Sequence, residues 1–528
     1  YIRVRRGDTI VKLLTAAQVR ALEHDALETL EISSAALMRR ASDALADIVL
    51  ELLPTGGSVA VFCGAGNNGG DGIGCAAELL RRGVAARVFL VGERRRMSAD
   101  AVEMELRLRE YGGELEAFDD APDVAPYTDT CAIIADAIFG IGLTRDIDGA
   151  ALDAVRLINN ARATVVSADI PSGVDADTGL ILGDAVRADV TATFIAPKIG
   201  LYVAPGAAHA GRVVVCDIGV PEELTADAQS RVFVTTPRDF ALPQRKIDVS
   251  KGDCGRVLIV AGSVGYTGAP VLAARAATRT GAGLVFLGVP RGIYAIAAAK
   301  CVGEICFPLA GGDTVEIDAW SEIEARLERA DALLIGPGLR NTDDTRVIVE
   351  SALNTASCPI ILDADGINAL AANINALDKA SRSVILTPHD GEFARLGGDP
   401  SHGRLTAAQS FAAAHNVTLI LKGFRTIIAS PDGTAFINTR GTPSMAKGGS
   451  GDVLAGMIAA LLAQGLSTRD ACVAAVYLHG RAGEIATARL GVYSVDSEDI
   501  TDAISVALNE YAEARSCTDF PNFHGRPR

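Results

Sequence analysis

Residues 59–72 read VAVFCGAGNNGGDG, and this stretch decides the fold of the first part of the chain. The apolar run Val59–Cys63 predicts a buried strand, Gly64–Gly72 predicts a tight turn, and Ile73–Arg82 has helical periodicity. A helix that begins after such a turn points backbone N–H groups and its positive dipole end at a bound anion. A second such stretch, GGSGD at 448–452, precedes another apolar helix. Two of them in one chain predict two phosphate-bearing ligands and two active sites.

Strand candidates alternate with helical segments along most of the chain, and a capping-box pattern at Thr15–Gln18 opens two helices that reach about Leu53. Several strand candidates are almost continuous apolar runs, which is typical of parallel strands buried on both faces. The pattern restarts near residue 236, so we expect two consecutive three-layer α/β/α domains at 1–236 and 237–515, with a tail at 516–528. The expected strands are Val59–Cys63, Arg87–Val91, Cys131–Ile138, Thr164–Ile170, Asp189–Ile195 and Arg212–Ile218, then Arg256–Ala261, Gly283–Val289, Ala332–Ile335, Ile360–Leu362, Val384–Leu386, Thr418–Leu421 and Thr426–Ala429.

The composition excludes several classes of partner. A net charge of −16 argues against binding to nucleic acid or to an anionic membrane, because both require positive surfaces. The ten cysteines form no CxxC pair and no zinc spacing, which favours free thiols in a reducing compartment. No apolar run approaches the roughly 20 residues of a membrane span. We therefore expect a cytoplasmic homo-oligomer; because residue 1 is not Met, the position of the true N-terminus stays open.

Three polar loops follow predicted strands of the first domain. The G-x-G-x-x-G spacing alone favours a nicotinamide oxidoreductase, but Asn67, Asn68 and Asp71 add amide oxygens and a carboxylate that suit a hard cation. DAIFGIGLTRD at 136–146 and SADIPSG at 167–173 place Asp136 and Asp169 at two further strand ends. Either aspartate alone would serve equally well as a helix cap or turn residue. Three such loops together favour a binding site.

In their order, NNGGDG, DAIFGxGL and DIPSG resemble the NAD(P)HX epimerase domain of bifunctional nicotinamide nucleotide repair enzymes, over about residues 15–220. The resemblance implies a Rossmann-like fold and a substrate, NADHX or NADPHX, which is NADH or NADPH hydrated at carbon 6 of the nicotinamide ring. Asp169 is the candidate for proton transfer between the two epimers. A K⁺ ion held by Asn68, Asp136 and Ser172 is also implied. The implied substrate contacts are Asn67, Asn68, Gly69, Gly70, Asp71, Gly140, Ile141, Gly142, Leu143, Thr144, Arg145, Asp146 and Asp169.

Asp452 begins the second apolar helix, where a carboxylate can take a proton from a substrate hydroxyl while backbone N–H groups stabilise a phosphoryl group in transfer. The plain alternative is a helix-capping aspartate. The chain has no Walker motif and no protein-kinase motif set. This arrangement resembles the ribokinase-like superfamily.

Within LTPHDGE at 386–392, the placement of His389 at a strand end favours a ligand contact over an ordinary loop histidine.

Other segments, KGDCG at 251–255, GPGL at 336–339, DADGIN at 363–368 and KGFRT at 422–426, resemble the ADP-dependent NAD(P)HX dehydratase domain over roughly 237–510. Arg340, Asp390 and Ser450 replace the glycine, proline and threonine common there, and Asp390 adds negative charge near a phosphate-rich site. The resemblance implies ADP as co-substrate, Mg²⁺, and Asp452 as the catalytic base. Implied substrate contacts are Ala282, Gly338, His389 and Asp452; implied nucleotide contacts are Lys422, Gly423, Phe424, Arg425, Thr426, Gly448, Gly449, Ser450 and Gly451.

Taken together, these expectations describe a repair enzyme. The first domain would equilibrate R- and S-NAD(P)HX, and the second would dehydrate the S-form to NAD(P)H while ADP becomes AMP and phosphate. Two alternatives stay open: a ribokinase-like small-molecule kinase fused to a dinucleotide-binding module, and a scaffold with an inactive N-terminal half.

Overall fold

The computed structural model describes residues 11–121 and 123–519. Two compact units divide the chain between residues 233 and 234, with the short segment 402–404 grouped with the first unit. This division lies close to residue 236, where the sequence pattern restarts. Helix α17 (Ser497–Asp519) continues past residue 516, where the tail was expected to begin, and the remainder of that tail lies outside the described residues.

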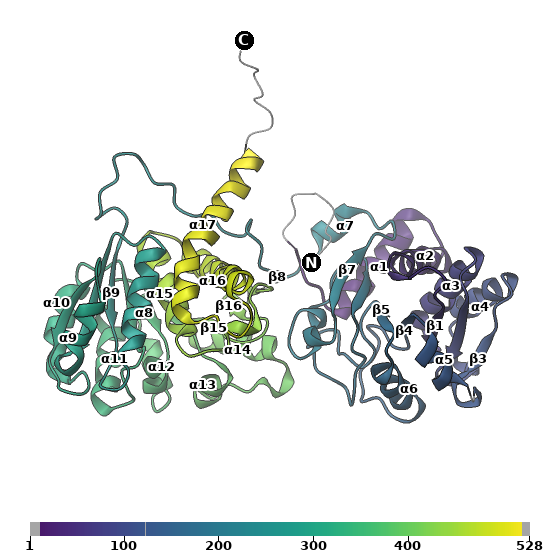
Figure 1. Cartoon of the computed structure of the whole chain (residues 1–528), viewed down its shortest axis with the longest axis horizontal. Coiled ribbons are helices and arrows are strands. Elements are labelled where there is room, and N and C mark those ends of the chain that lie inside the picture. The colour runs from purple at the N-terminus through teal and green to yellow at the C-terminus, as the bar shows by residue number, and fades with distance from the viewer. Residues whose placement is uncertain (1–10, 122, 520–528) are drawn as a thin grey trace, which may run out of the picture. The chain divides into compact units, whose positions relative to one another are not determined.

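A parallel seven-stranded sheet forms the centre of the first unit, in the order β3-β2-β1-β4-β5-β6-β7 (Figure 1). Its strands are β1 (Val59–Cys63), β2 (Ala86–Leu90), β3 (Leu115–Ala117), β4 (Ile133–Ala137), β5 (Thr164–Ala168), β6 (Val190–Phe194) and β7 (Arg212–Cys216). Its helices are α1 (Ala16–Leu30), α2 (Ser34–Leu52), α3 (Asn67–Arg81), α4 (Ala99–Glu110), α5 (Val124–Thr130), α6 (Gly149–Asn160) and α7 (Glu222–Asp227).

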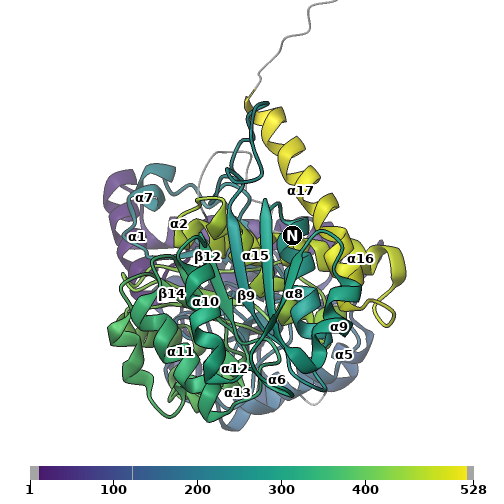
Figure 2. The same cartoon turned by 90° about the vertical axis from the view of Figure 1, so that its left-hand side faces the viewer.

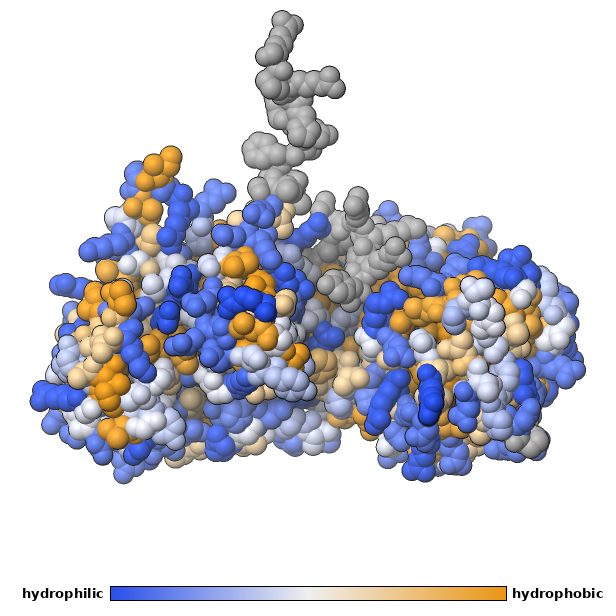
Figure 3. Space-filling view, in the orientation of Figure 1, coloured by the Kyte–Doolittle hydropathy of each residue, from blue (hydrophilic) through white to orange (hydrophobic). Residues whose placement is uncertain are grey.

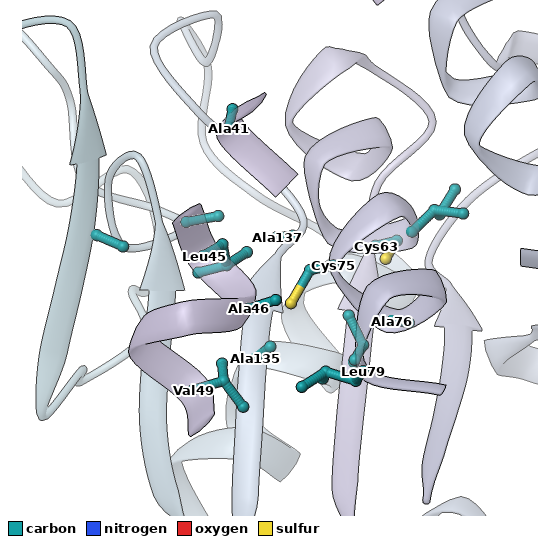
Figure 4. Packing of buried hydrophobic residues seen from close by; sticks show 14 of the residues in the cluster. Ala41, Leu45, Ala46, Val49, Cys63, Cys75, Ala76, Leu79, Ala135 and Ala137 are labelled. Atoms are coloured by element: carbon teal, nitrogen blue, oxygen red, sulfur yellow. The ribbon is translucent and has the colours of Figure 1, made fainter. Parts of the chain in front are cut away.

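Both faces of this sheet are buried, as the continuous apolar strands predicted. In β1, Val59, Val61 and Cys63 pack toward α2, α3 and α4, whereas Ala60 and Phe62 pack toward α5 and α6. Successive residues of a strand point to opposite faces, so one apolar pentapeptide contributes to two cores. Figure 4 shows the first core, where side chains of α2 and α3 meet Ala135 and Ala137 of β4.

The second unit is built on a ten-stranded sheet in the order β11-β10-β9-β12-β13-β14-β15-β16-β17-β8. The strands from β11 to β15 pair in parallel, and β15, β16 and β17 pair antiparallel. The bounds are β8 (Val232–Val234), β9 (Arg256–Val260), β10 (Leu284–Pro290), β11 (Ile305–Leu309), β12 (Ala332–Ile335), β13 (Ile360–Leu362), β14 (Val384–Leu386), β15 (Thr418–Leu421), β16 (Ile427–Ala429) and β17 (Ala435–Ile437).

Helices cover both faces of this second sheet as well (Figure 2). One layer holds α8 (Gly268–Arg279), α9 (Arg291–Lys300), α15 (Ser450–Ala463), α16 (Thr468–Leu490) and α17. The other holds α10 (Trp320–Leu327), α11 (Asp343–Thr355), α12 (Asp365–Leu370), α13 (Asp390–Arg395) and α14 (Arg404–His415). The α/β class with three-layer domains is therefore confirmed in both units.

Every strand expected from the sequence is present, but β3, β8, β11 and β17 were not predicted. Helix α3 also begins at Asn67, six residues before the expected start at Ile73, so Asn67–Asp71 form its first turns instead of a free loop. On the face drawn in Figure 3, hydrophilic side chains cover most of the surface and apolar areas lie between them. Within 11–121 and 123–519, no helix is long and apolar enough to cross a membrane.

Candidate active sites

A cavity of about 830 Å³ lies in the first unit, where β1, β4 and β5 end. The carboxyl ends of parallel strands meet at one sheet edge, the usual ligand edge of such folds. The lining includes most of the residues predicted to contact substrate: Asn67, Asn68, Asp71, Gly140, Ile141, Gly142, Leu143, Thr144, Arg145, Asp146 and Asp169. Gly69 and Gly70 are buried in α3 instead, and a Cβ on Gly69 would lie 1.7 Å from the carbonyl oxygen of Gly64.

Asp136, at the end of β4, is fully buried and forms a network of hydrogen bonds. The Ser172 hydroxyl donates to its Oδ1 at 2.6 Å, while the Ser172 backbone N–H and the Ser167 hydroxyl donate to its Oδ2 at 2.9 and 2.7 Å. Burial raises the pKa of Asp136, and these hydrogen bonds oppose the shift. The network brings the side chains of Asp136 and Ser172 together.

The amide of Asn68, at the start of α3, lies close to the loop that follows β4. Its Oδ1 and Nδ2 are both buried and make no hydrogen bond among the described residues. A Cβ added to Gly140 would lie 3.0 Å from that Oδ1, so the loop after β4 approaches closely. Unsatisfied buried polar atoms are costly in a folded protein, and at a cavity wall they indicate a missing ligand.

Asp169 follows β5 and is held in the left-handed backbone region, with φ of 65°. Such a conformation is strained for an aspartate and is typical of functional positions. Lys198, which is fully buried, forms an ion pair with Asp169 Oδ1 and also donates to Thr193 Oγ1 at 2.9 Å and to the Phe194 carbonyl at 2.8 Å. The ammonium is therefore held in place on three sides.

Two further carboxyl groups face the same cavity. Burial raises the pKa of Asp71 well above its usual range, and the nearby carboxylates of Asp169 and Glu23 raise it further. Burial and Asp169 also raise the pKa of Glu23, which projects from α1. Lys198 lowers the pKa of both Asp71 and Glu23, but burial and the neighbouring acids outweigh it.

In the second unit, Asp452 lies in the first turn of α15 near Asp363 and Lys422. Asp363 follows β13, and its Oδ1 accepts from Lys422 Nζ at 2.9 Å and from Thr387 Oγ1 at 2.7 Å. A Cβ added to Gly451 would lie 3.3 Å from the same Nζ, which places α15 beside the pair. Burial and Asp363 raise the pKa of Asp452 to about 7, and Lys422 moderates the shift. A carboxylate with this pKa is suited to act as a general base near neutral pH.

Lys422 Nζ also lies 3.8 Å from Oε2 of Glu392, which belongs to α13. Burial disfavours its charged form, but Asp363 and Glu392 outweigh burial and raise its pKa. Its ammonium therefore stays charged between the acids of this strand edge. Behind the helix start, Ser450 Oγ lies 3.3 Å from His479 Nε2, and burial lowers the pKa of His479 to about 4. The imidazole is thus neutral and fixes the Ser450 hydroxyl.

The remaining predicted residues of this unit differ in placement. The imidazole of His389 caps α13, with its Nδ1 accepting from the Gly391 N–H at 3.0 Å. Gly338 follows β12, where its carbonyl accepts from Ser263 Oγ at 2.7 Å. Gly423, Phe424, Arg425 and Thr426 form the turn between β15 and β16, with Phe424 58% exposed.

The structure does not bring Ala282 into this group. Ala282 lies two residues before Leu284, the first residue of β10, which is in register with Arg256 at the start of β9. It therefore lies at the amino edge of the parallel sheet, whereas Gly338, Asp363 and Lys422 follow carboxyl ends. A seven-residue strand separates these edges by roughly 23 Å, because each residue advances about 3.3 Å.

Four charged residues at the two sites carried no predicted role: Glu23, Lys198, Asp363 and Glu392. Asp363 lies in DADGIN and Glu392 lies in LTPHDGE, and both segments follow predicted strands. Their position at strand ends was the feature of the sequence that could have indicated a role in the site. Lys198 and Glu23 gave no comparable signal, because their partners are far away in the sequence.

Comparison with known proteins agrees with this geometry. A family model described as NAD(P)H-hydrate dehydratase matches residues 257–506, and one described as YjeF-related protein N-terminus matches residues 34–200. A bifunctional NAD(P)H-hydrate repair enzyme from Moorella thermoacetica is 38% identical over 521 residues, covering 95% of this chain and 97% of that protein. The chain belongs to the bifunctional NAD(P)H-hydrate repair enzyme family. The family's enzyme from Salinibacter ruber is 37% identical, again covering 95% of this chain and 97% of its own length.

Among solved structures, an ADP/ATP-dependent NAD(P)H-hydrate dehydratase from Bacillus subtilis, co-crystallised with ATP and Mg²⁺, is 32% identical. It covers 52% of this chain and 96% of its own length, with a TM-score of 0.46. A ribokinase-like superfamily protein from Enterococcus faecalis is 28% identical, covers 53% and 96%, and has a TM-score of 0.48. As a member of the repair enzyme family, the chain is an enzyme that carries an epimerase domain and a dehydratase domain.

Proposed function

We propose that the first unit interconverts R- and S-NAD(P)HX and that the second dehydrates S-NAD(P)HX to NAD(P)H while ADP becomes AMP and phosphate. The observation that carries the second half is Asp452, a half-buried carboxylate in the first turn of α15 beside Asp363 and Lys422, whose pKa is raised to about 7. The substrate carries a hydroxyl at carbon 6 of its ring, and hydroxide is a poor leaving group. Transfer of a phosphoryl group to that hydroxyl makes the later elimination easy.

In this mechanism, Asp452 takes the proton of the carbon-6 hydroxyl as its oxygen attacks the terminal phosphorus of ADP. The backbone N–H groups at the start of α15 stabilise negative charge on the phosphoryl group as AMP departs. Breakage of the bond between carbon 6 and the phosphate oxygen then releases phosphate, and loss of a proton from the neighbouring ring carbon restores the dihydronicotinamide. We assign Lys422–Thr426 and Gly448–Gly451 to the nucleotide and Gly338 and His389 to the hydrated substrate.

Mg²⁺ suits this site as a partner of the ADP phosphates. No group of three or more His, Cys, Asp or Glu side chains that could hold a metal occurs in the part of the chain that the structure describes. Magnesium commonly uses only one or two carboxylates together with substrate phosphates. Asp363 and Glu392 are the carboxylates at this strand edge that would hold it. When bound, the ion would neutralise charge on the phosphates.

A K⁺ ion suits the first unit, where Asn68, Asp136 and Ser172 offer oxygen ligands. The support is the buried carboxylate of Asp136 beside the unpartnered amide of Asn68. A cation there would offset the buried negative charge and satisfy the Asn68 oxygen. We expect KCl to raise the thermal unfolding temperature above that in tetramethylammonium chloride, and Asn68→Ala to remove this difference. An equal unfolding temperature in both salts would contradict the site.

The test of the whole proposal is the conversion of purified R- and S-NADHX with ADP, followed by recovery of NADH absorbance. Wild-type protein should consume both epimers. Asp452→Asn should lower the dehydration rate by about 10²- to 10⁴-fold, the range expected for loss of a general base, and should leave epimerisation of R-NADHX intact. Normal turnover by Asp452→Asn would remove Asp452 from its role, and no turnover of either hydrate by the wild type would reject the function.

A cytoplasmic location and a homo-oligomeric assembly complete the proposal. The nine cysteines whose side chains the structure describes are all free, which is compatible with a reducing compartment. Sedimentation analysis of the full chain tests the assembly, and a monomer at micromolar concentration would contradict it.

A further inference from the structure

The cavity of the first unit contains more acid–base groups than one proton-transfer residue requires. Asp71 enters it from the start of α3, after β1, and Asp169 enters from the end of β5. Strand β4 lies between β1 and β5 in the sheet, so the two carboxyl groups reach the cavity from separate strand ends. Lys198 is paired with Asp169, and Glu23 of α1 completes the group.

The two aspartates lie in opposite electrostatic environments. Asp169 forms an ion pair with the buried ammonium of Lys198. Asp71 is half-buried, and burial together with the carboxylates of Asp169 and Glu23 raises its pKa. Two carboxyl groups that face one cavity from such different surroundings are the usual arrangement for acid and base roles.

We propose that Asp71 and Asp169 act as an acid–base pair during epimerisation, with Asp71 as proton donor to the departing carbon-6 hydroxyl and Asp169 as proton acceptor from the water that adds. This inference rests on the epimerase function proposed above. It assigns a catalytic role to Asp71 and a positioning role to Lys198, which orients Asp169 through their ion pair.

The chemistry balances without another reactant. Carbon 6 carries both the hydroxyl and the ring nitrogen, so the nitrogen lone pair can form a C=N bond as the C–O bond breaks. The Asp71 proton leaves with the hydroxyl as water. A water molecule then adds to the other face of carbon 6, the C=N electron pair returns to nitrogen, and the water proton goes to Asp169. The reverse reaction uses the two groups in exchanged roles, and proton exchange with solvent restores the starting state.

Asp71→Asn tests the proton donor, because asparagine keeps the size of the side chain but cannot supply this proton. We expect kcat for R-NADHX epimerisation to fall by about 10²-fold or more with little change in KM, and Asp169→Asn to do the same. ADP-dependent dehydration of S-NADHX by the same variants should stay at the wild-type level. Glu103→Gln is the matched control, because Glu103 is exposed on α4 and lies outside the lining of the cavity.

Different failures of this experiment have different meanings. If Asp71→Asn keeps the wild-type kcat, or changes only KM, then Asp71 is not the acid and the proposal falls while the epimerase function stands. If the wild type does not epimerise, the proposed function itself fails. Epimerisation in H₂¹⁸O adds a second readout: each epimerised molecule should carry solvent oxygen at carbon 6, after subtraction of uncatalysed exchange. Retention of the original oxygen would overturn the C–O cleavage step.

Glu23→Gln examines how the environment sets the protonation of Asp71. The charged groups around Asp71 are Asp169, Glu23 and Asp100, which raise its pKa, and Lys198, which lowers it. An acid catalyst loses activity as the pH rises through its pKa. Removal of the Glu23 charge should therefore move that loss to lower pH, and an unchanged pH profile would contradict the coupling of Glu23 to Asp71.

Discussion

The two glycine-rich helix starts resemble each other in sequence but use glycine for different physical reasons. At the start of α3, Gly69 is required because a Cβ there would lie 1.7 Å from the Gly64 carbonyl oxygen. At the start of α15, Gly449 is required because its φ is 92°, a conformation that side-chain-bearing residues rarely adopt. The first glycine lets a helix pack closely against its own turn, and the second lets the backbone reverse direction before the helix begins. A glycine motif therefore identifies neither a fold nor a reaction by itself.

The aspartates of these two helix starts, Asp71 and Asp452, differ in the charges that surround them. Asp71 is surrounded mainly by other acids, whereas Asp452 has Asp363 on one side and Lys422 on another. The lysine moderates the shift of Asp452, so its pKa stays at about 7. Asp71 has less compensation, so burial and the surrounding acids raise its pKa well above its usual range. In our proposals the first aspartate gives a proton and the second takes one.

Gly69→Ala should produce the largest effect, because the added methyl group meets backbone atoms that cannot move aside. We expect the free energy of unfolding of the first unit to fall by about 3 kcal/mol, the upper range for overpacking, with loss of epimerisation. Gly66→Ala is the matched control, since its Cβ would have no atom within 4 Å. Denaturant unfolding of the three proteins measures the difference, and equal stability of both variants would show that close packing does not explain the first loop.

Dehydration should depend on pH through Asp452. A base with a pKa of about 7 loses its active form below that pH, so kcat/KM should fall about tenfold per pH unit in the acidic range. The rate of Asp452→Asn should show no such dependence. A wild-type rate that stays constant from pH 7 down to pH 5 would mean that Asp452 is ionised over this whole range. That result would contradict a pKa of about 7 for Asp452.

The sequence predicted the sheets because their strands are buried on both faces, so Val59–Cys63 or Ile360–Leu362 are nearly all apolar. It missed β3, an edge strand of three residues in which Glu116 and Ala117 are not buried. A strand this short with one buried side chain has neither an apolar run nor an alternation to detect. Strand β11 contains Pro308, which argues against a strand, yet it lies at a sheet edge where proline is tolerated.

The candidate sites were predictable to the extent that residues follow strands. Asp136, Asp169 and Asp452 each lie at a strand end or helix start, and parallel pairing brings Asp136 and Asp169 to one edge of the first sheet. The Lys198 pairing was not predictable, because it joins residues 29 positions apart through the packing of two loops. The expectation for Ala282 did not hold because a motif match does not say at which end of its strand a residue lies.

Asp452→Asn should also change stability in a pH-dependent way. Since burial raises the folded-state pKa of Asp452 from 3.8 to about 7, the folded protein holds a proton there that the unfolded chain releases between these values. The wild type therefore loses stability as the pH rises from about 4 to 7. Asparagine has no proton to lose, so Asp452→Asn should be more stable than wild type by about 2 kcal/mol at pH 8. This advantage should vanish at pH 4, and a variant less stable than wild type at pH 8 would reverse the sign we derive.

Of the four predictions in this comparison, Gly449→Ala should have the smallest effect. An alanine with a strained backbone can be accommodated at position 449, whereas the clash of a Cβ with backbone atoms at position 69 cannot be relieved. The positive φ costs about 1–2 kcal/mol, and the nearest atoms to the new Cβ are the side-chain atoms Leu272 Cδ1 at 2.7 Å and Ser497 Oγ at 2.8 Å, which can move. Gly303→Ala is the control, because Gly303 is an exposed loop glycine before β11, the nearest atom to its Cβ is Thr278 Cγ2 at 4.0 Å, and its φ is not positive. Because Gly449 orients the N–H groups that precede Asp452, we expect the KM for ADP to rise in Gly449→Ala while it stays unchanged in Gly303→Ala. If both variants bound ADP equally well, the left-handed turn would serve folding alone, and the contrast between the two glycine motifs would not extend to ligand binding.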